Sequence, residues 1–133
     1  MASALSEKIE NQSETDQKAG RRNHLTDCIC IIGAIVLSNA AAIFAALGLN
    51  SVLTAITTSL SGIIITVQTT MNFRGRAAWY FLKSAKLDSI SLALDYEGLT
   101  EPLAAKQFRE TEVEMEKDWA KFVQGGRAGA KKG

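Results

Sequence analysis

The chain has 133 residues, enough for one small domain but not for two. Charged residues make up 22% of it, yet none lies between Cys28 and Met71. A soluble domain of this size should not run for 44 residues without a charge, so the sequence argues against an ordinary soluble enzyme and indicates a membrane protein. The formal net charge of +1 gives no reason to expect nucleic-acid binding.

Residues 1–27 form a polar segment ahead of the first apolar stretch. A cleaved signal peptide would place its apolar core nearer the N-terminus, so we read these residues as a polar cytoplasmic segment instead. Leu5 and Ile9 are compatible with a short helix, and disorder fits the composition equally well.

The uncharged residues 28–71 are predicted to form a transmembrane helical hairpin. Gly48 and Asn50 are turn residues near its middle, which gives helices over about 28–47 and 51–71. Each helix has about 20 residues, roughly one hydrocarbon thickness at 1.5 Å per residue. The second contains ten Ser, Thr or Gln residues, so a soluble hairpin buried in a larger complex is the competing interpretation.

The flanking charges predict the orientation of this hairpin. Basic residues lie on both outer flanks and none lies in the connecting turn. They are Lys18, Arg21, Arg22, Arg74, Arg76, Lys83 and Lys86. By the positive-inside rule both termini are cytoplasmic and the turn is external, and we expect the plasma (inner) membrane.

Each predicted helix has one face of small or polar side chains. On the first, the candidates for helix packing are Ala34, Ser38, Ala41 and Ala45. On the second, the candidates for lining a pore are Thr54, Thr58, Ser61 and Gln68. The polar face of the second helix has two possible destinations: packing against the first helix, or contact with water in a pore built from several copies.

Residues 72–124 are predicted to form a cytoplasmic helical hairpin. Phe73 to Glu97 continues the second membrane helix, Gly98 ends it, and Thr100 caps a further helix that runs to about Val123. The apolar positions of that helix that we expect to assemble subunits or pair the hairpin are Phe108, Met115, Trp119 and Phe122. Residues 125–133 are Gly-rich and basic, which is typical of a flexible tail.

Catalytic chemistry is not indicated. Cys28 and Cys30 would point about 200° apart on a helix and cannot share a metal ion there. The chain has one histidine, His24, and no phosphate-binding loop or nucleophile elbow. We therefore expect no enzymatic activity, no cofactor and no metal.

The layout resembles the SLATT-type two-transmembrane effector domains. The matching stretches are Met71 to Phe81, then Leu94 to Gly98, then Glu114 to Trp119, and the similarity spans roughly residues 20 to 123. The resemblance implies a pore-forming effector of antiviral or conflict systems. It also implies a cytoplasmic sensor or nucleotide-signalling partner that triggers the pore.

These observations predict an all-α membrane protein that lies in the lipid bilayer as a homo-oligomer and forms a pore or channel-like effector. The alternative is a non-conducting membrane anchor or scaffold whose cytoplasmic helices recruit a partner. A small lysis pore of phage type is a third possibility, which the long cytoplasmic part disfavours.

Overall fold

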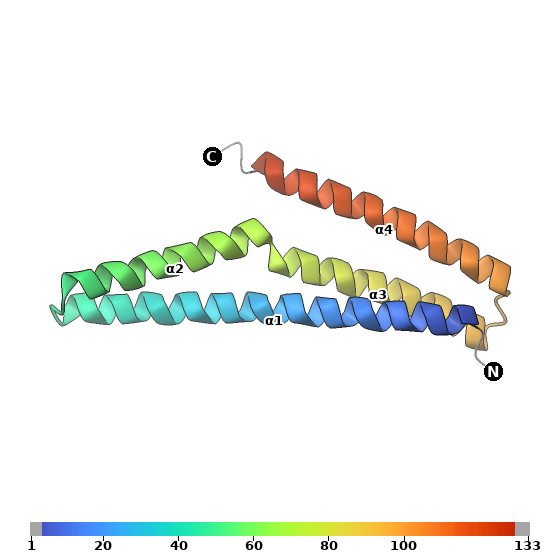
Figure 1. Cartoon of the computed structure of the whole chain (residues 1–133), viewed down its shortest axis with the longest axis horizontal. Helices are drawn as coiled ribbons and strands as arrows, with labels where there is room; N and C mark the ends of the chain where they lie inside the picture. The colour runs from blue at the N-terminus through green and yellow to red at the C-terminus, as the bar shows by residue number, and fades with distance from the viewer. Residues whose placement is uncertain (1–3, 130–133) are drawn as a thin grey trace. The chain divides into compact units, whose positions relative to one another are not determined.

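The computed structural model describes residues 4–129, with side chains placed over residues 4–122. These residues form four α-helices, α1 (Ala4–Ala46), α2 (Ser51–Met71), α3 (Phe73–Tyr96) and α4 (Glu101–Gly129), shown in Figure 1. The described residues contain no strand, so the prediction of an all-α fold is confirmed.

The chain divides into two compact units. Residues 22–76 form one unit, which we call the apolar hairpin. The second unit combines residues from both sides of the hairpin in sequence, namely the described ranges 4–21 and 77–129, and we call it the polar bundle. The sequence interpretation treated the N-terminal segment and the later helices as separate regions, whereas the structure places them in one unit.

The apolar hairpin turns over residues 47–50, within one residue of the predicted boundaries. Gly48 has a φ of +65°, a conformation that glycine adopts without the cost of a Cβ atom. Asn50 is the N-cap of α2, and its side-chain oxygen accepts a hydrogen bond of 2.9 Å from the backbone N–H of Val52. These two residues end one helix and start the next.

Two helical ranges, Ala4–Ala46 and Ser51–Tyr96, include stretches long and apolar enough to cross a membrane. Only 11% and 6% of these apolar stretches are buried. A core helix of a soluble protein would be mostly buried, so within the described residues neither stretch has the burial of a core helix. The exposed side chains include Ile32, Ile43 and Ile63.

The predicted continuation of the second helix into residues 73–97 is wrong in one respect. The helix breaks at Asn72, whose φ of +46° lies in the left-handed region. Asparagine tolerates this conformation better than most residues, and its side-chain oxygen accepts a 3.1 Å hydrogen bond from the N–H of Gly75. Asn72 therefore ends α2 and caps α3.

The N-terminal segment is helical from Ala4, and α1 runs without interruption to Ala46. Its inward-facing residues recur at alternating intervals of three and four, the spacing of helices that pack side by side. In the polar bundle these residues are Ser6, Ile9, Ser13, Asp16 and Gly20. Only one of the five is a large apolar residue, which is why apolar periodicity alone left this segment as short helix or disorder.

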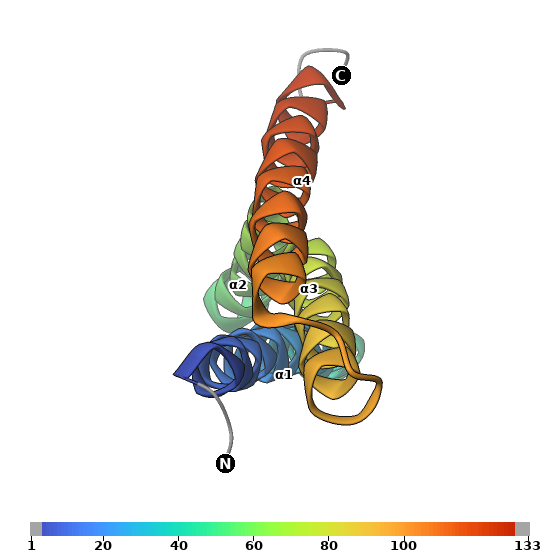
Figure 2. The same cartoon turned by 90° about the vertical axis from the view of Figure 1, so that its right-hand side faces the viewer.

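The core of the polar bundle joins three helices. It consists of Ile9 from α1, Leu87 and Ile90 from α3, and Ala104 and Phe108 from α4. The connection between α3 and α4, seen end-on in Figure 2, contains Gly98 with a φ of +72°. The predicted helical hairpin of residues 72–124 thus gains the start of α1 as a third helix.

Gly20 allows a close approach within the polar bundle. A Cβ atom built on it would lie 3.1 Å from the ring of Phe81 on α3. That distance is shorter than ordinary van der Waals contact, so a side chain larger than glycine at this position would displace the ring of Phe81.

The predicted flexible tail of residues 125–133 differs from the structure over its first part. Helix α4 extends to Gly129, past the predicted end near Val123. Residues 130–133 lie outside the described residues.

The core assignment predicts unequal effects for two leucines of α3. Leu87 is fully buried and Leu92 is 56% exposed. Leu87→Ala should lower the free energy of unfolding by about 2–5 kcal/mol because it leaves a cavity, whereas Leu92→Ala should change it by about 0.5 kcal/mol or less. Circular dichroism during thermal unfolding in detergent measures both, and equal effects would contradict the assigned core.

Candidate functional site

The two helices of the apolar hairpin pack through small and polar side chains. On α1 the buried or half-buried positions that follow one 3–4 repeat in this unit are Asn23, Asp27, Cys30, Ala34, Leu37, Ala41 and Phe44, and Thr26, Cys28, Gly33 and Ala40 are half-buried outside that repeat. On α2 the buried or half-buried positions are Thr54, Thr57, Ser61, Ile64 and Gln68. Both sets repeat at intervals of three and four residues. We call this contact the hairpin seam.

Ser61 lies at the centre of the hairpin seam and is 4% exposed. Its hydroxyl donates a 3.1 Å hydrogen bond to the backbone carbonyl of Ala34. It lies 2.7 Å from the hydroxyl of Ser38, which is left to act as the donor in that pair. Two apolar helices are therefore joined by a buried chain of hydrogen bonds.

The seam also contains a carboxylate that the sequence interpretation did not single out. It lies at the end of the seam that is farther from the turn. Asp27 precedes the uncharged stretch by one residue and is only 5% exposed. The side-chain amide of Gln68 donates a 2.9 Å hydrogen bond to its Oδ1 atom. The spacing of the sequence could have identified Asp27 as a seam residue, because it stands seven residues before Ala34 and therefore on the same helix face.

The four predicted pore-lining residues do not share one exposed wall within the chain. Ser61 and Gln68 bond to α1, and Thr54 is half-buried at the seam. Thr58 is exposed, and its hydroxyl donates a 2.9 Å hydrogen bond to the carbonyl of Thr54. Packing, one of the two destinations left open by the sequence, accounts for Ser61 and Gln68 within the chain.

The four predicted packing residues of α1 also divide. Ala34 and Ala41 are buried at the seam, and Ser38 reaches it through its hydrogen bond although it is exposed overall. Ala45 is exposed. The seam also includes Leu37 and Phe44. Two packed helices bury every residue of the 3–4 repeat, whether its side chain is large or small.

Outside the seam, α2 carries two exposed flanks of opposite character. The apolar flank comprises Leu53, Ile56, Leu60, Ile63, Val67 and Met71. The hydroxyl flank comprises Ser51, Ala55, Thr58, Gly62, Thr66 and Thr69. Three of its threonines donate to carbonyls one turn earlier at 2.8–2.9 Å, and their oxygen lone pairs stay available to the surroundings.

Aromatic side chains pack between α3 and α4 in the polar bundle. The ring centroids of Trp79 and Trp119 are 5.0 Å apart, and those of Trp119 and Phe122 are 5.5 Å apart. The indole N–H of Trp79 donates a 3.1 Å hydrogen bond to the carbonyl of Met115. Of the four predicted assembly residues, Phe108 and Met115 are buried within the chain and the other two are half-buried.

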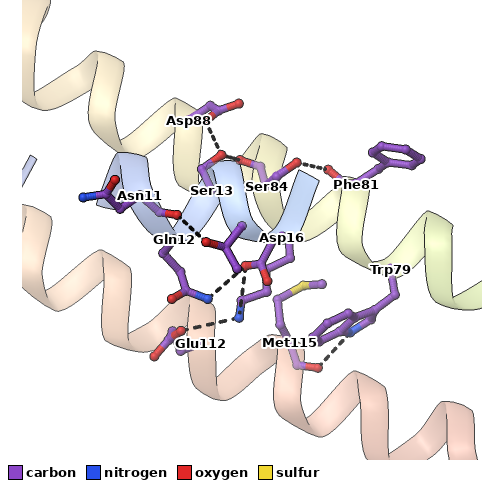
Figure 3. Close-up of polar contacts among 12 residues, drawn as sticks. Asn11, Gln12, Ser13, Asp16, Trp79, Phe81, Ser84, Asp88, Glu112 and Met115 are labelled. Atoms are coloured by element: carbon purple, nitrogen blue, oxygen red, sulfur yellow. Dashed lines mark hydrogen bonds and ion pairs between the residues drawn. The ribbon is translucent and has the colours of Figure 1, made fainter. Parts of the chain in front are cut away.

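A charged network crosses the same bundle. The Lys83 ammonium lies 3.3 Å from the carboxylate of Asp16 and 3.5 Å from that of Glu112, so it links α3 to α1 and α4. The side chains of Lys83 and Asp16 are only 12% and 7% exposed. Gln12 also donates to Asp16, and Ser13 bonds to Asp88 (Figure 3).

Three of the basic residues used to predict orientation are paired. Lys83 belongs to the charged network, and Lys86 lies 3.0 Å from Glu114. Lys18 lies 2.7 Å from Glu14, and its hydrogen bond and positive charge lower the pKa of that carboxyl.

The site offers no ligand set for a metal ion, since no group of three His, Cys, Asp or Glu side chains gathers anywhere in the described part of the chain. Comparison with known proteins finds no matching family model, no similar curated protein and no similar solved structure. The functional argument therefore rests on the hairpin and the bundle themselves.

The seam predicts that Ser61 and Thr58 respond differently to the same change. Ser61→Leu should lower the free energy of unfolding by about 1–3 kcal/mol, because the buried site has no room for the added carbons and loses two hydrogen bonds. Thr58→Leu should be close to neutral in detergent, because Thr58 is exposed. Thermal unfolding followed by circular dichroism compares them, and a neutral Ser61→Leu would refute this packing.

The charged network predicts a large effect of Lys83→Met. The change leaves the carboxylate of Asp16 buried without its cation, which typically costs about 3–5 kcal/mol. Lys106→Met is the matched control, because Lys106 is exposed and its ion pair is with Glu110 one turn away on the same helix. Denaturant unfolding of the two variants should separate them, and a Lys83 variant as stable as the control would disprove the network's role.

Proposed function

We propose that the apolar hairpin inserts into a membrane with both chain ends in the cytoplasm, and that the protein acts as a homo-oligomeric pore or channel-like effector. The hydroxyl flank of α2 forms the wall of the pore. The polar bundle assembles subunits and receives the trigger from a sensor or nucleotide-signalling partner, as the resemblance to SLATT-type effectors implies.

Exposed apolar side chains support insertion. They cover most of the hairpin outside its seam and are exposed among the described residues. An apolar surface of this extent is unfavourable in water and suits hydrocarbon. Arg22 and Arg74 lie at the two ends of the chain segment that forms the hairpin, where the positive-inside rule places cytoplasmic charge.

The hydroxyl flank is the observation that carries the pore proposal. Its hydroxyls recur at Ser51, Thr58, Thr66 and Thr69, with Ala55 and Gly62 between them and the exposed Ile65 at its edge. The flank stays exposed after the hairpin has formed and lies beside the seam. Two helices cannot enclose a pore, so a wall built from this flank requires several copies. Of the four pore-lining residues predicted from the sequence, Thr58 alone belongs to this flank. The proposed lining therefore consists of Thr58 together with Ser51, Thr66 and Thr69.

One observation favours the non-conducting scaffold. Thr58, Thr66 and Thr69 already bond to their own helix, which lowers the cost of facing lipid. In that case the hydroxyl flank needs no water, and the half-buried Trp119 and Phe122 would take part in recruiting a partner.

Single-channel recording in planar bilayers tests the pore. Wild-type protein should give discrete conductance steps, and Thr58→Leu should abolish them or reduce them several-fold by replacing a hydroxyl with a larger apolar group on the wall. Thr58→Ser keeps the hydroxyl and should conduct. Val67→Leu adds bulk on the apolar flank and serves as the matched control.

Insertion of every variant is checked by resistance of the membrane fraction to alkaline extraction. Unchanged conductance in inserted Thr58→Leu would eliminate the hydroxyl flank as the wall. Inserted wild-type protein that stays silent would favour the scaffold.

A further inference from the structure

Asn39 is a polar residue in the apolar part of α1 for which the hairpin supplies no partner. It lies seven residues before the end of α1, or about 10 Å from the turn at 1.5 Å per residue. Its side chain is exposed, and within the described residues it forms no hydrogen bond. By contrast, the buried polar residues Ser61 and Asp27 are both bonded.

An unpaired amide at this depth is unfavourable in a membrane. The side chain has two N–H donors and an oxygen acceptor, and hydrocarbon satisfies none of them. Asparagine differs here from the threonines of α2, which bond to carbonyls of their own helix. Asn39 therefore needs a partner from outside the chain.

The neighbours of Asn39 indicate what kind of partner fits. A stripe on the same side of α1 recurs at alternating intervals of four and three and contains Cys28, Ile32, Ile35, Asn39, Ala42 and Ala46. All except Cys28, which is half-buried, are exposed. Apart from the single amide the stripe is apolar or small, which fits a dry contact between helices better than a wall facing water.

We propose that this stripe is a contact between copies of the chain, with parallel α1 helices around a common axis and Asn39 amides hydrogen-bonded at one depth. An amide is self-complementary, because each copy offers both a donor and an acceptor. A single asparagine in an otherwise apolar repeat is a known means of fixing register between helices. The inference rests on the insertion part of the proposed function and not on conduction.

The stripe lies on the face of α1 that points away from α2. At 100° per residue the centre of the stripe is displaced by about 150° from the seam residues of α1, so a contact through it does not involve α2.

The association of single-residue variants tests the contact without recording conductance. Asn39→Leu should weaken self-association about 5- to 30-fold, the range typical of losing one amide pair between membrane helices. Asn39→Gln keeps the amide and should associate nearly as well as the wild type. Leucine has a high helix propensity and is favourable in a membrane, so the expected weaker self-association of Asn39→Leu would not be caused by a loss of insertion. Sedimentation in detergent gives the association constants.

The two native cysteines provide an internal control for geometry. Cys28 belongs to the stripe, whereas Cys30 lies at the hairpin seam. In membrane vesicles a short bis-maleimide should link copies of the Cys30→Ser variant, which keeps Cys28. It should link copies of Cys28→Ser poorly, and Asn39→Leu should reduce the Cys28 linkage.

Equal association of Asn39→Leu and wild type would overturn the contact, as would cross-linking through Cys30 as efficient as through Cys28. Either result would concern only the contact between copies of the chain through the stripe on α1. Failure of the pore proposal would instead leave these results unchanged and appear as silent bilayers.

Discussion

The packing of α1 along one repeating face is the constraint on which both units depend. From Ser6 to Phe44 its inward-facing residues alternate at intervals of three and four, in the polar bundle and in the apolar hairpin alike. Most of them are small or polar, so helices can approach closely and bond to one another. The same spacing brings Asp16 to Lys83 in one unit and Ala34 to Ser61 in the other.

Polar groups inside the protein are satisfied in pairs, and this limits what remains for function. Among the described residues no buried side-chain nitrogen or oxygen lacks a partner. Burying a polar group without a partner is costly, so residues such as Ser61 and Gln68 are committed to holding the hairpin together. The polar groups left for assembly or water are those outside the seam, above all Asn39 and Thr58.

The long uncharged stretch made the hairpin and its turn predictable, because a helix of about 20 apolar residues and a Gly-Asn turn are local properties. The break at Asn72 was missed because its left-handed conformation depends on a single residue and on the cap that it gives to α3. The N-terminal segment was left open between a short helix and disorder because Ser6, Ser13 and Asp16 are buried by their partners on α3, and not by their own hydrophobicity.

The sequence by itself determined the helical class, the two apolar stretches long enough to span a membrane and the position of the turn, since these follow from composition and local periodicity. It also identified a polar face on α2. Only the tertiary structure decided which part of that face is occupied by α1 and which is left exposed. The reason is physical: a serine or glutamine has the same helical position whether it bonds to a neighbouring helix or to water, and only the neighbour's backbone and side chains select between them.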